Sequence, residues 1–165
     1  MDIKRQYDHG KLGNFLFDIC AKISIKLYKI KFLYWFLQFT WGLVWILVGL
    51  IVSLILICCG QKPIKTPFGW RFEIGKNWGG CDLGIVYIRD KKTNNKLDSL
   101  DMHEMGHCIT QNLICGPLFI FCVAIPSAAR YWIDTFWGLK RPYDAAWFED
   151  LATVGGEYFC KIKNK

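Results

Sequence analysis

A long apolar stretch without a charge, from Phe32 to Cys58, limits the possible folds more than any other feature of the sequence. A helix of about 20 apolar residues crosses the hydrocarbon core of a bilayer, and this stretch has 27 residues. A core helix of that length without a charge is too long for a chain of 165 residues, which has room for one modest domain. We therefore expect one long transmembrane helix over residues 32–59, in an integral protein of the cell membrane with membrane lipid as its partner.

The residues before this stretch, 1–31, form a basic and amphipathic segment. Apolar residues recur there at helical spacing with lysines along the flank of the stripe: Leu16, Ile19, Ile23, Leu27 and Ile30, with Lys22, Lys26 and Lys29. The pattern predicts a helix on an anionic membrane surface, although the alternation from Ile23 to Leu27 also permits a strand. The net charge of +7 suits such a surface. The sequence shows neither a basic patch on a soluble face nor an interleaved aromatic platform, so we do not expect a nucleic acid as partner.

Two observations bear on the orientation in the membrane, and they conflict. The basic residues far from the span, Lys4, Arg5 and Lys11, favour a cytoplasmic N-terminus. The eight cysteines show no metal-binding or redox spacing, and so many free thiols are unusual in the extracytoplasmic domain that this orientation implies. Cys58 and Cys59 end the span and are candidates for acylation.

Residues 60–165 predict a small domain, so that the whole chain is α+β and predominantly α. Gly60 to Gly69 contains two prolines and two glycines and is typical of a linker. The runs "WRFEIG" and "CDLGIVYIRD", separated by a turn at "KNWGG", predict an antiparallel hairpin. A polar loop, "KKTNNK", comes before the next helix, which Asp98 or Ser99 caps and Gly116-Pro117 ends.

That helix carries the motif "HEMGH" at residues 103–107. His103 and His107 are four residues apart, so they project from one face and can bind one tetrahedral zinc ion. Glu104 is placed to accept a proton from a metal-bound water instead of binding the metal. Gly106 allows another backbone or a substrate to approach closely. The alternative is a pair of helix histidines without a metal.

A zinc site needs a third protein ligand, and a helix predicted to begin near Asp144 offers one. Its pattern Glu149-x-x-Ala-Thr153 resembles the second helix of gluzincin metallopeptidases, in which a glutamate completes a His-His-Glu set. The resemblance implies Glu149 as the ligand, and it implies that Thr153 replaces an aspartate that hydrogen-bonds to a ligand histidine. The alternative third ligands are Asp144, Asp150 and Glu157. His9, which precedes the span, is a poor candidate.

A broader resemblance extends from about Gly79 to Gly155. The order of a glycine-rich strand, "HEMGH", "GPL", "IPS" and a late glutamate-bearing helix is similar to a group of small bacterial membrane proteins with an HExGH motif. It implies a zincin-like domain with a Zn²⁺ cofactor, although Thr110 replaces the glutamine of that group and Gln111 follows one residue later. In zincins an edge strand beside the active-site helix binds the substrate backbone, and "GIVYIRD" is in the position for it.

The segment 117–138 is apolar up to Ile125, contains a break at Pro126, and then becomes amphipathic with Arg130 and Asp134. It is too short before its first charge for a clear span, so we expect it to lie in or dip into the membrane, with a second transmembrane helix as the alternative. HExGH also occurs in site-two-protease-like intramembrane peptidases, but the polar approach "NNKLDSLDM" to His103 argues against an intramembrane site.

Together these features predict a membrane-bound zinc metallopeptidase that hydrolyses a peptide or protein substrate with zinc-activated water. His103, His107 and Glu149 would bind the metal, Glu104 would act as the base, and either Tyr143 or Tyr131 would donate to the oxyanion. One alternative is a non-catalytic membrane protein that keeps this scaffold for binding or assembly. Another is an interaction protein without a metal. The oligomeric state is not predicted.

Overall fold

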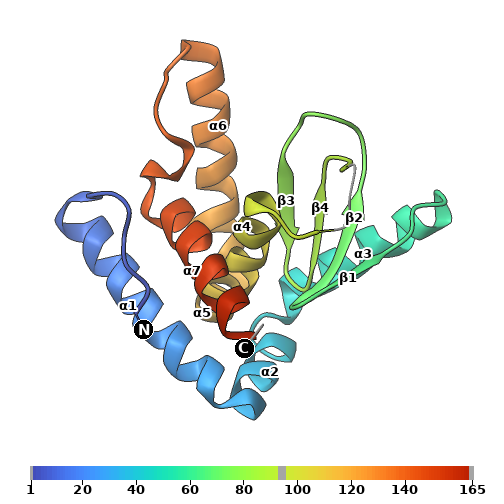
Figure 1. The fold of residues 1–165 in the computed structure, drawn as a ribbon, viewed down its shortest axis with the longest axis horizontal. Coiled ribbons are helices and arrows are strands. Elements are labelled where there is room, and N and C mark those ends of the chain that lie inside the picture. Colours follow the sequence, from blue (N-terminus) through green and yellow to red (C-terminus); the bar gives the residue numbers. More distant parts are fainter. Residues whose placement is uncertain (1, 93–95, 164–165) are drawn as a thin grey trace.

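The computed structural model describes residues 2–92 and 96–163, and it confirms an α+β fold that is mostly helical (Figure 1). The helices are α1 (Gly10–Lys29), α2 (Lys31–Phe39), α3 (Leu43–Cys58), α4 (Ser99–His107), α5 (Leu113–Cys115), α6 (Ile125–Trp137) and α7 (Trp147–Lys163). The strands are β1 (Ile64–Thr66), β2 (Gly69–Glu73), β3 (Gly80–Leu83) and β4 (Val86–Arg89). Residues 93–95 of the predicted polar loop lie outside the described residues.

The expectation of one continuous helix over residues 32–59 is wrong. α2 ends at Phe39 and α3 begins at Leu43, with a bend of 70° between them. Polar contacts hold the bend: the Gln38 amide donates to the Cys108 carbonyl at 2.9 Å, and the Trp41 indole donates to the Ile114 carbonyl at 3.0 Å. A straight helix would carry these two side chains away from their partners.

Among the described residues, no single helix is both long and apolar enough to cross a membrane. Two bent pairs reach the required length and composition together: α2 with α3, and residues 99–118 with residues 120–137, the latter bent by 111°. The predicted break at Pro126 is also wrong. The helical run continues through this proline, from the π turn Ile120–Ala124 directly into α6, and the chain turns instead at Gly116, where φ is +51°.

The sheet has the strand order β1-β2-β4-β3. The predicted antiparallel pairing of residues 70–75 with residues 81–90 is wrong, because β2 and β4 are parallel and "CDLGIVYIRD" folds back on itself as the β3–β4 hairpin. Gly84, with φ of +77°, supplies the turn. The predicted linker contains β1, which forms a hairpin with β2. The pattern of a strand predicts which side chains lie on each of its two faces, but it does not predict which strands pair with each other. The predicted pairing is wrong for this reason.

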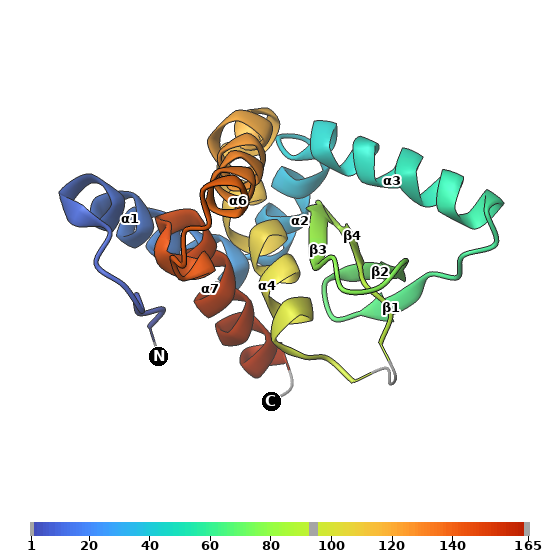
Figure 2. The same ribbon diagram turned by 90° about the horizontal axis from the view of Figure 1, so that it is seen from above.

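Helices α4 and α7 pack closely in the centre of the molecule, where Figure 2 shows them side by side. A Cβ on Gly106 would lie 1.8 Å from the Ala152 carbonyl oxygen, and one on Gly156 would lie 1.8 Å from the Met102 carbonyl oxygen. Only glycine permits this separation of the two backbones. The predicted N-terminal helix is present as α1, whose Phe17 packs on Leu151 of α7.

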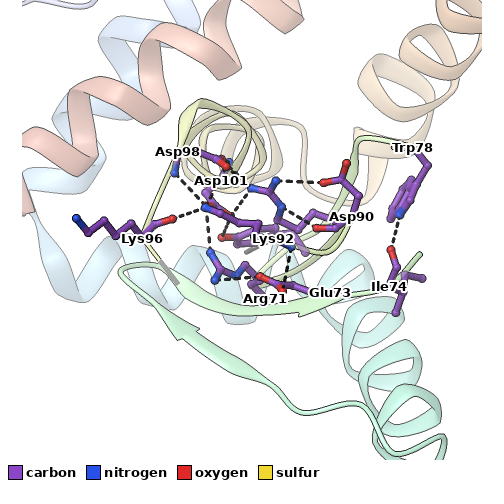
Figure 3. A network of polar contacts seen from close by, with 11 residues as sticks. Arg71, Glu73, Ile74, Trp78, Asp90, Lys92, Lys96, Asp98 and Asp101 are labelled. Carbon is purple, nitrogen blue, oxygen red and sulfur yellow. Dashed lines mark hydrogen bonds and ion pairs between the residues drawn. The ribbon is translucent and has the colours of Figure 1, made fainter. Parts of the chain in front are cut away.

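A polar network fixes the N-terminus of α4 to the sheet (Figure 3). Asp98 and Asp101 form a capping box, as the predicted N-cap at Asp98 requires. The buried Arg71 pairs with Asp101 at 3.1 Å, and Arg89 donates to Asp98 at 2.7 Å. Lys92 lies within 3.0 Å of both aspartates. The start of the histidine-bearing helix is therefore fixed by charge as well as by its cap.

Replacing Gly156 by alanine should lower the melting temperature in detergent by about 10 °C, because overpacking of this kind costs about 3 kcal/mol in a chain of this size. Gly155→Ala is the matched control, since its Cβ would meet only the Thr110 side chain, at 2.8 Å. Equal losses in the two variants would contradict the close-packing argument.

The Asp98 cap predicts a dependence of stability on pH. Burial opposes ionisation of Asp98, but the Asp101 N–H, Lys92 and Arg89 outweigh it and hold the pKa of Asp98 below its usual range. The folded pKa is the lower one, so the stabilisation is complete above the unfolded value of about 3.9 and disappears as the pH falls through the folded value.

Denaturant midpoints of the wild type and Asp98→Asn, measured near pH 6 and near pH 3, test this prediction. The wild type should lose more stability on acidification, because asparagine keeps the cap acceptor but does not titrate. Asp98→Ala should cost about 1 kcal/mol at the higher pH through loss of the cap. Parallel losses in the wild type and Asp98→Asn would rule out this role for the carboxylate.

Candidate metal centre

The three predicted metal ligands meet between α4 and α7. His103 Nε2 and His107 Nε2 lie 3.2 Å apart, and Glu149 Oε2 lies 3.1 Å from the first and 3.3 Å from the second. All three side chains are buried. Ligand atoms about 2.0–2.1 Å from a tetrahedral zinc ion are separated by about 3.3–3.4 Å, so this triangle has the size that zinc requires.

The surroundings of Glu149 also fit a metal. Both of its oxygens are buried, and neither accepts a hydrogen bond with good geometry from the described residues. Burial opposes the charge, but the two imidazoles outweigh it and hold the pKa of Glu149 below its usual range. A carboxylate that is buried, ionised and poorly hydrogen-bonded is stabilised by a bound cation.

The outer nitrogen of each histidine has a partner that leaves Nε2 free for the metal. His107 Nδ1 lies 2.6 Å from Gln111 Oε1, and the Gln111 amide nitrogen donates to the Phe148 carbonyl. Since that nitrogen donates, Oε1 is the acceptor and His107 Nδ1 carries a proton. His103 Nδ1 lies 2.8 Å from the Thr153 hydroxyl.

Gln111 is the hydrogen-bond partner of His107, a role that the sequence did not assign to it. It lies on a wide π turn, Cys108–Asn112, which continues α4. Thr110, at the position of the glutamine in the resembling group, instead donates to the Gly106 carbonyl of its own helix at 2.7 Å. Such wide turns within helices are frequent at functional sites.

Asp144 lines the same cleft as the two histidines but does not belong to the group of possible ligands, and the other two alternative ligands lie elsewhere. Asp150 accepts from His9 Nε2 at 2.8 Å and from the backbone N–H of Gln6 at 3.0 Å. Glu157 pairs with Lys161 at the surface, at 3.2 Å. The histidine before the apolar stretch is therefore a partner of Asp150 and not a ligand.

A cleft of about 810 Å³ opens over the centre, with both histidines and Glu104 in its lining. The Glu104 carboxylate lies against Gly80 of β3, where a Cβ would be 2.5 Å from Glu104 Oε1. The edge strand beside the cleft is thus β3, and the prediction that "GIVYIRD" forms this edge is wrong, because β4 is buried between β2 and β3. Glu104 is close to the metal centre without belonging to it.

Both predicted tyrosines line the cleft. The Tyr143 ring is closer to the centre, 5.8 Å from the His103 ring between centroids, and its hydroxyl lies 3.0 Å from Ser127 Oγ. Burial raises the pKa of Tyr143, so its phenol is a proton donor at neutral pH. The geometry therefore favours Tyr143 over Tyr131 for contact with a bound substrate.

Sequence reasoning missed one residue of the cleft, Asp82 of β3. Its two oxygens are buried without a hydrogen-bond partner of good geometry among the described residues, and burial raises the pKa of Asp82 to about 7. The sequence signal was an aspartate in an otherwise apolar strand, "GCDLGIVYI".

Comparison of the chain with protein-family models, curated proteins and solved structures gives no significant match. The function therefore has to be inferred from the geometry of the centre and its cleft.

Removing the Gln111 side-chain acceptor should weaken zinc binding. Gln111→Leu and Thr153→Val should each raise the dissociation constant by about 10–100-fold, because each leaves a ligand imidazole without its orienting partner. Thr153→Asp should strengthen binding. The measurement is competition with a zinc chelator, and Thr110→Val is the control for the loss of a hydroxyl. Unchanged affinity in the first two variants would show that these partners do not support the centre.

Proposed function

We propose that the protein is a membrane-associated zinc metallopeptidase. The observation that carries this proposal is the meeting of His103, His107 and Glu149 at zinc-ligand spacing, beside a cleft that the two histidines line. A zinc ion held there would lower the pKa of a bound water to about 7 and polarise a carbonyl.

The residues of the chain have separate roles in this proposal. Glu104 would accept the proton of the attacking water and return it to the leaving amine. β3 would bind an extended substrate through its free backbone groups, since it forms an edge of the sheet beside Glu104. Tyr143 would donate a hydrogen bond to the oxygen of the scissile carbonyl as it gains charge.

The exposed apolar surface supports the membrane part of the proposal. Nine large apolar side chains of α3 are 36–65% exposed: Leu43, Val44, Leu47, Val48, Leu50, Ile51, Leu54, Ile55 and Ile57. At about 1 kcal/mol for each half-exposed side chain, leaving them in water would forfeit about 9 kcal/mol. That is comparable to the total stability of a domain, and it supports an apolar environment around α3. Localisation in the cell membrane with a cytoplasmic N-terminus remains part of the proposal.

Three variants test the proposed activity. Glu104→Gln should keep its zinc and lose about 10²–10⁴-fold in hydrolysis of a peptide library, because the base is lost but the ligands remain. Glu149→Ala should lose both zinc and hydrolysis, since two imidazoles alone hold the ion weakly. The matched control is Glu157→Gln, a surface glutamate on the same helix that should retain both.

The readouts are metal content per chain and cleavage products identified by mass spectrometry in detergent. Full zinc occupancy in Glu149→Ala would contradict the ligand set. A wild-type protein that binds zinc but cleaves nothing would contradict the peptidase and leave a metal-binding scaffold.

A further inference from the structure

We infer that the cleft opens sideways into the lipid, so that the substrate is a polypeptide embedded in or anchored to the same membrane. This inference rests on the proposed function and adds a substrate class to it. The cleft is bordered by two helices, α3 through Trp45 and α6 through Tyr131 and Trp132, and by β3 on the remaining side. The medium around α3 and α6 is therefore also the medium at the opening of the cleft.

Helices α3 and α6 are the elements that require an apolar environment. No residue of α6 is buried, and four of its aromatic side chains are more than half exposed: Tyr131 at 53%, Trp132 at 57%, Phe136 at 80% and Trp137 at 78%. The exposed face of α3 is aliphatic along its whole length. A bilayer that covers both helices also reaches the cleft that they line.

The two helices lie on the same side of the molecule. In Figure 2, α6 and α3 follow the upper edge of the view, whereas the described ends of the chain and the start of α4 lie toward the lower edge. Figure 1 shows α3 lying across the view and α6 upright, so the axes of both run along this side of the molecule and not through it. This is the arrangement of helices that lie in a membrane surface.

Aromatic side chains on both borders of the opening support the same orientation. Trp78, on the loop between β2 and β3, is 40% exposed and lines the cleft together with Tyr131 and Trp132. Tryptophan and tyrosine concentrate where lipid headgroups meet the hydrocarbon. Lys140, which follows α6, is exposed and positively charged, and it fits anionic headgroups, whereas Arg141 pairs with Asp134 of α6.

The polar network lies at the N-terminus of α4 (Figure 3), where the Asp98 side chain is 41% exposed to solvent. At a rise of about 1.5 Å per residue, His103 and His107 lie about 7 Å and 13 Å along the helix from Asp98. The metal centre is thus within two to three turns of water, while its cleft faces the apolar side. A substrate held in the bilayer reaches such a centre by lateral diffusion, which raises its effective concentration.

Two forms of one quenched fluorescent peptide test the inference with the full chain in phosphatidylcholine–phosphatidylglycerol vesicles. The forms share the cleavable sequence, and one carries an N-terminal palmitoyl group where the other carries acetyl. We expect kcat/KM for the palmitoylated form to exceed that for the acetylated form by at least about tenfold. In Trp132→Gln this ratio should fall, whereas Phe32→Gln, an 81% exposed residue of α2 outside the cleft, should preserve it.

Equal rates for the two peptides would overturn the inference and leave the peptidase intact. Absence of zinc-dependent cleavage of both would contradict the peptidase, and a second measurement then decides the lateral opening. A photoreactive benzoylphenylalanine at position 132 should crosslink to the acyl chains of radiolabelled phospholipid, and one at Lys91, in the polar region, should not. No lipid adduct at position 132, or equal adducts at both positions, would overturn the lateral opening whether or not the protein is active.

Discussion

The close contact between α4 and α7 is the interaction on which the rest of the molecule depends. At Gly106 and Gly156 the two helices approach so closely that a methyl group on either would overlap a carbonyl of the other. This separation brings Glu149 within 3.3 Å of both histidines and places the Thr153 hydroxyl 2.8 Å from His103 Nδ1. A centre built from two helices needs their separation fixed to a few tenths of an ångström, because metal–ligand distances tolerate little error. Glycine fixes it here by backbone contact, which is stiffer than contact between side chains.

The remainder of the fold holds this helix pair in place. The polar network binds the start of α4 to the sheet, and the bend between α2 and α3 is joined to the wide turn that follows α4. The bend and the wide turn depend on each other, because Gln38 donates to the Cys108 carbonyl and accepts from Asn112 at 3.1 Å. All three residues are buried, so the apolar chain around them carries a small polar core. That core aligns Gln111 with His107.

What could be predicted from the sequence was mostly local. The spacing of His103 and His107, the cap at Asp98 and the amphipathic N-terminal helix follow from a few neighbouring residues, and helical geometry converts such spacing into position. Glu149 was reached through a resemblance, and the geometry of the described residues is consistent with it. The predictions failed where the structure depends on contacts with residues that are distant in the sequence. The bend at residues 40–42 depends on carbonyl groups some seventy residues away, and β2 gives no sign that its neighbour is parallel. Asp82 was not predicted as a residue of the cleft, because a single aspartate in an apolar strand matches no motif.

The contacts of Asp150 have a consequence for the order in which the molecule can assemble. Its carboxylate, adjacent in sequence to Glu149, accepts from the backbone N–H of Gln6 and from His9, 144 and 141 residues away. Contacts over such separations close the largest loops in a chain, so they form late and after most of it has been synthesised. The glutamate side of the centre is therefore completed only when the N-terminal segment meets the last helix. A ribosome-bound chain would display the two histidines long before it could hold zinc between them, which delays any activity until the fold is closed.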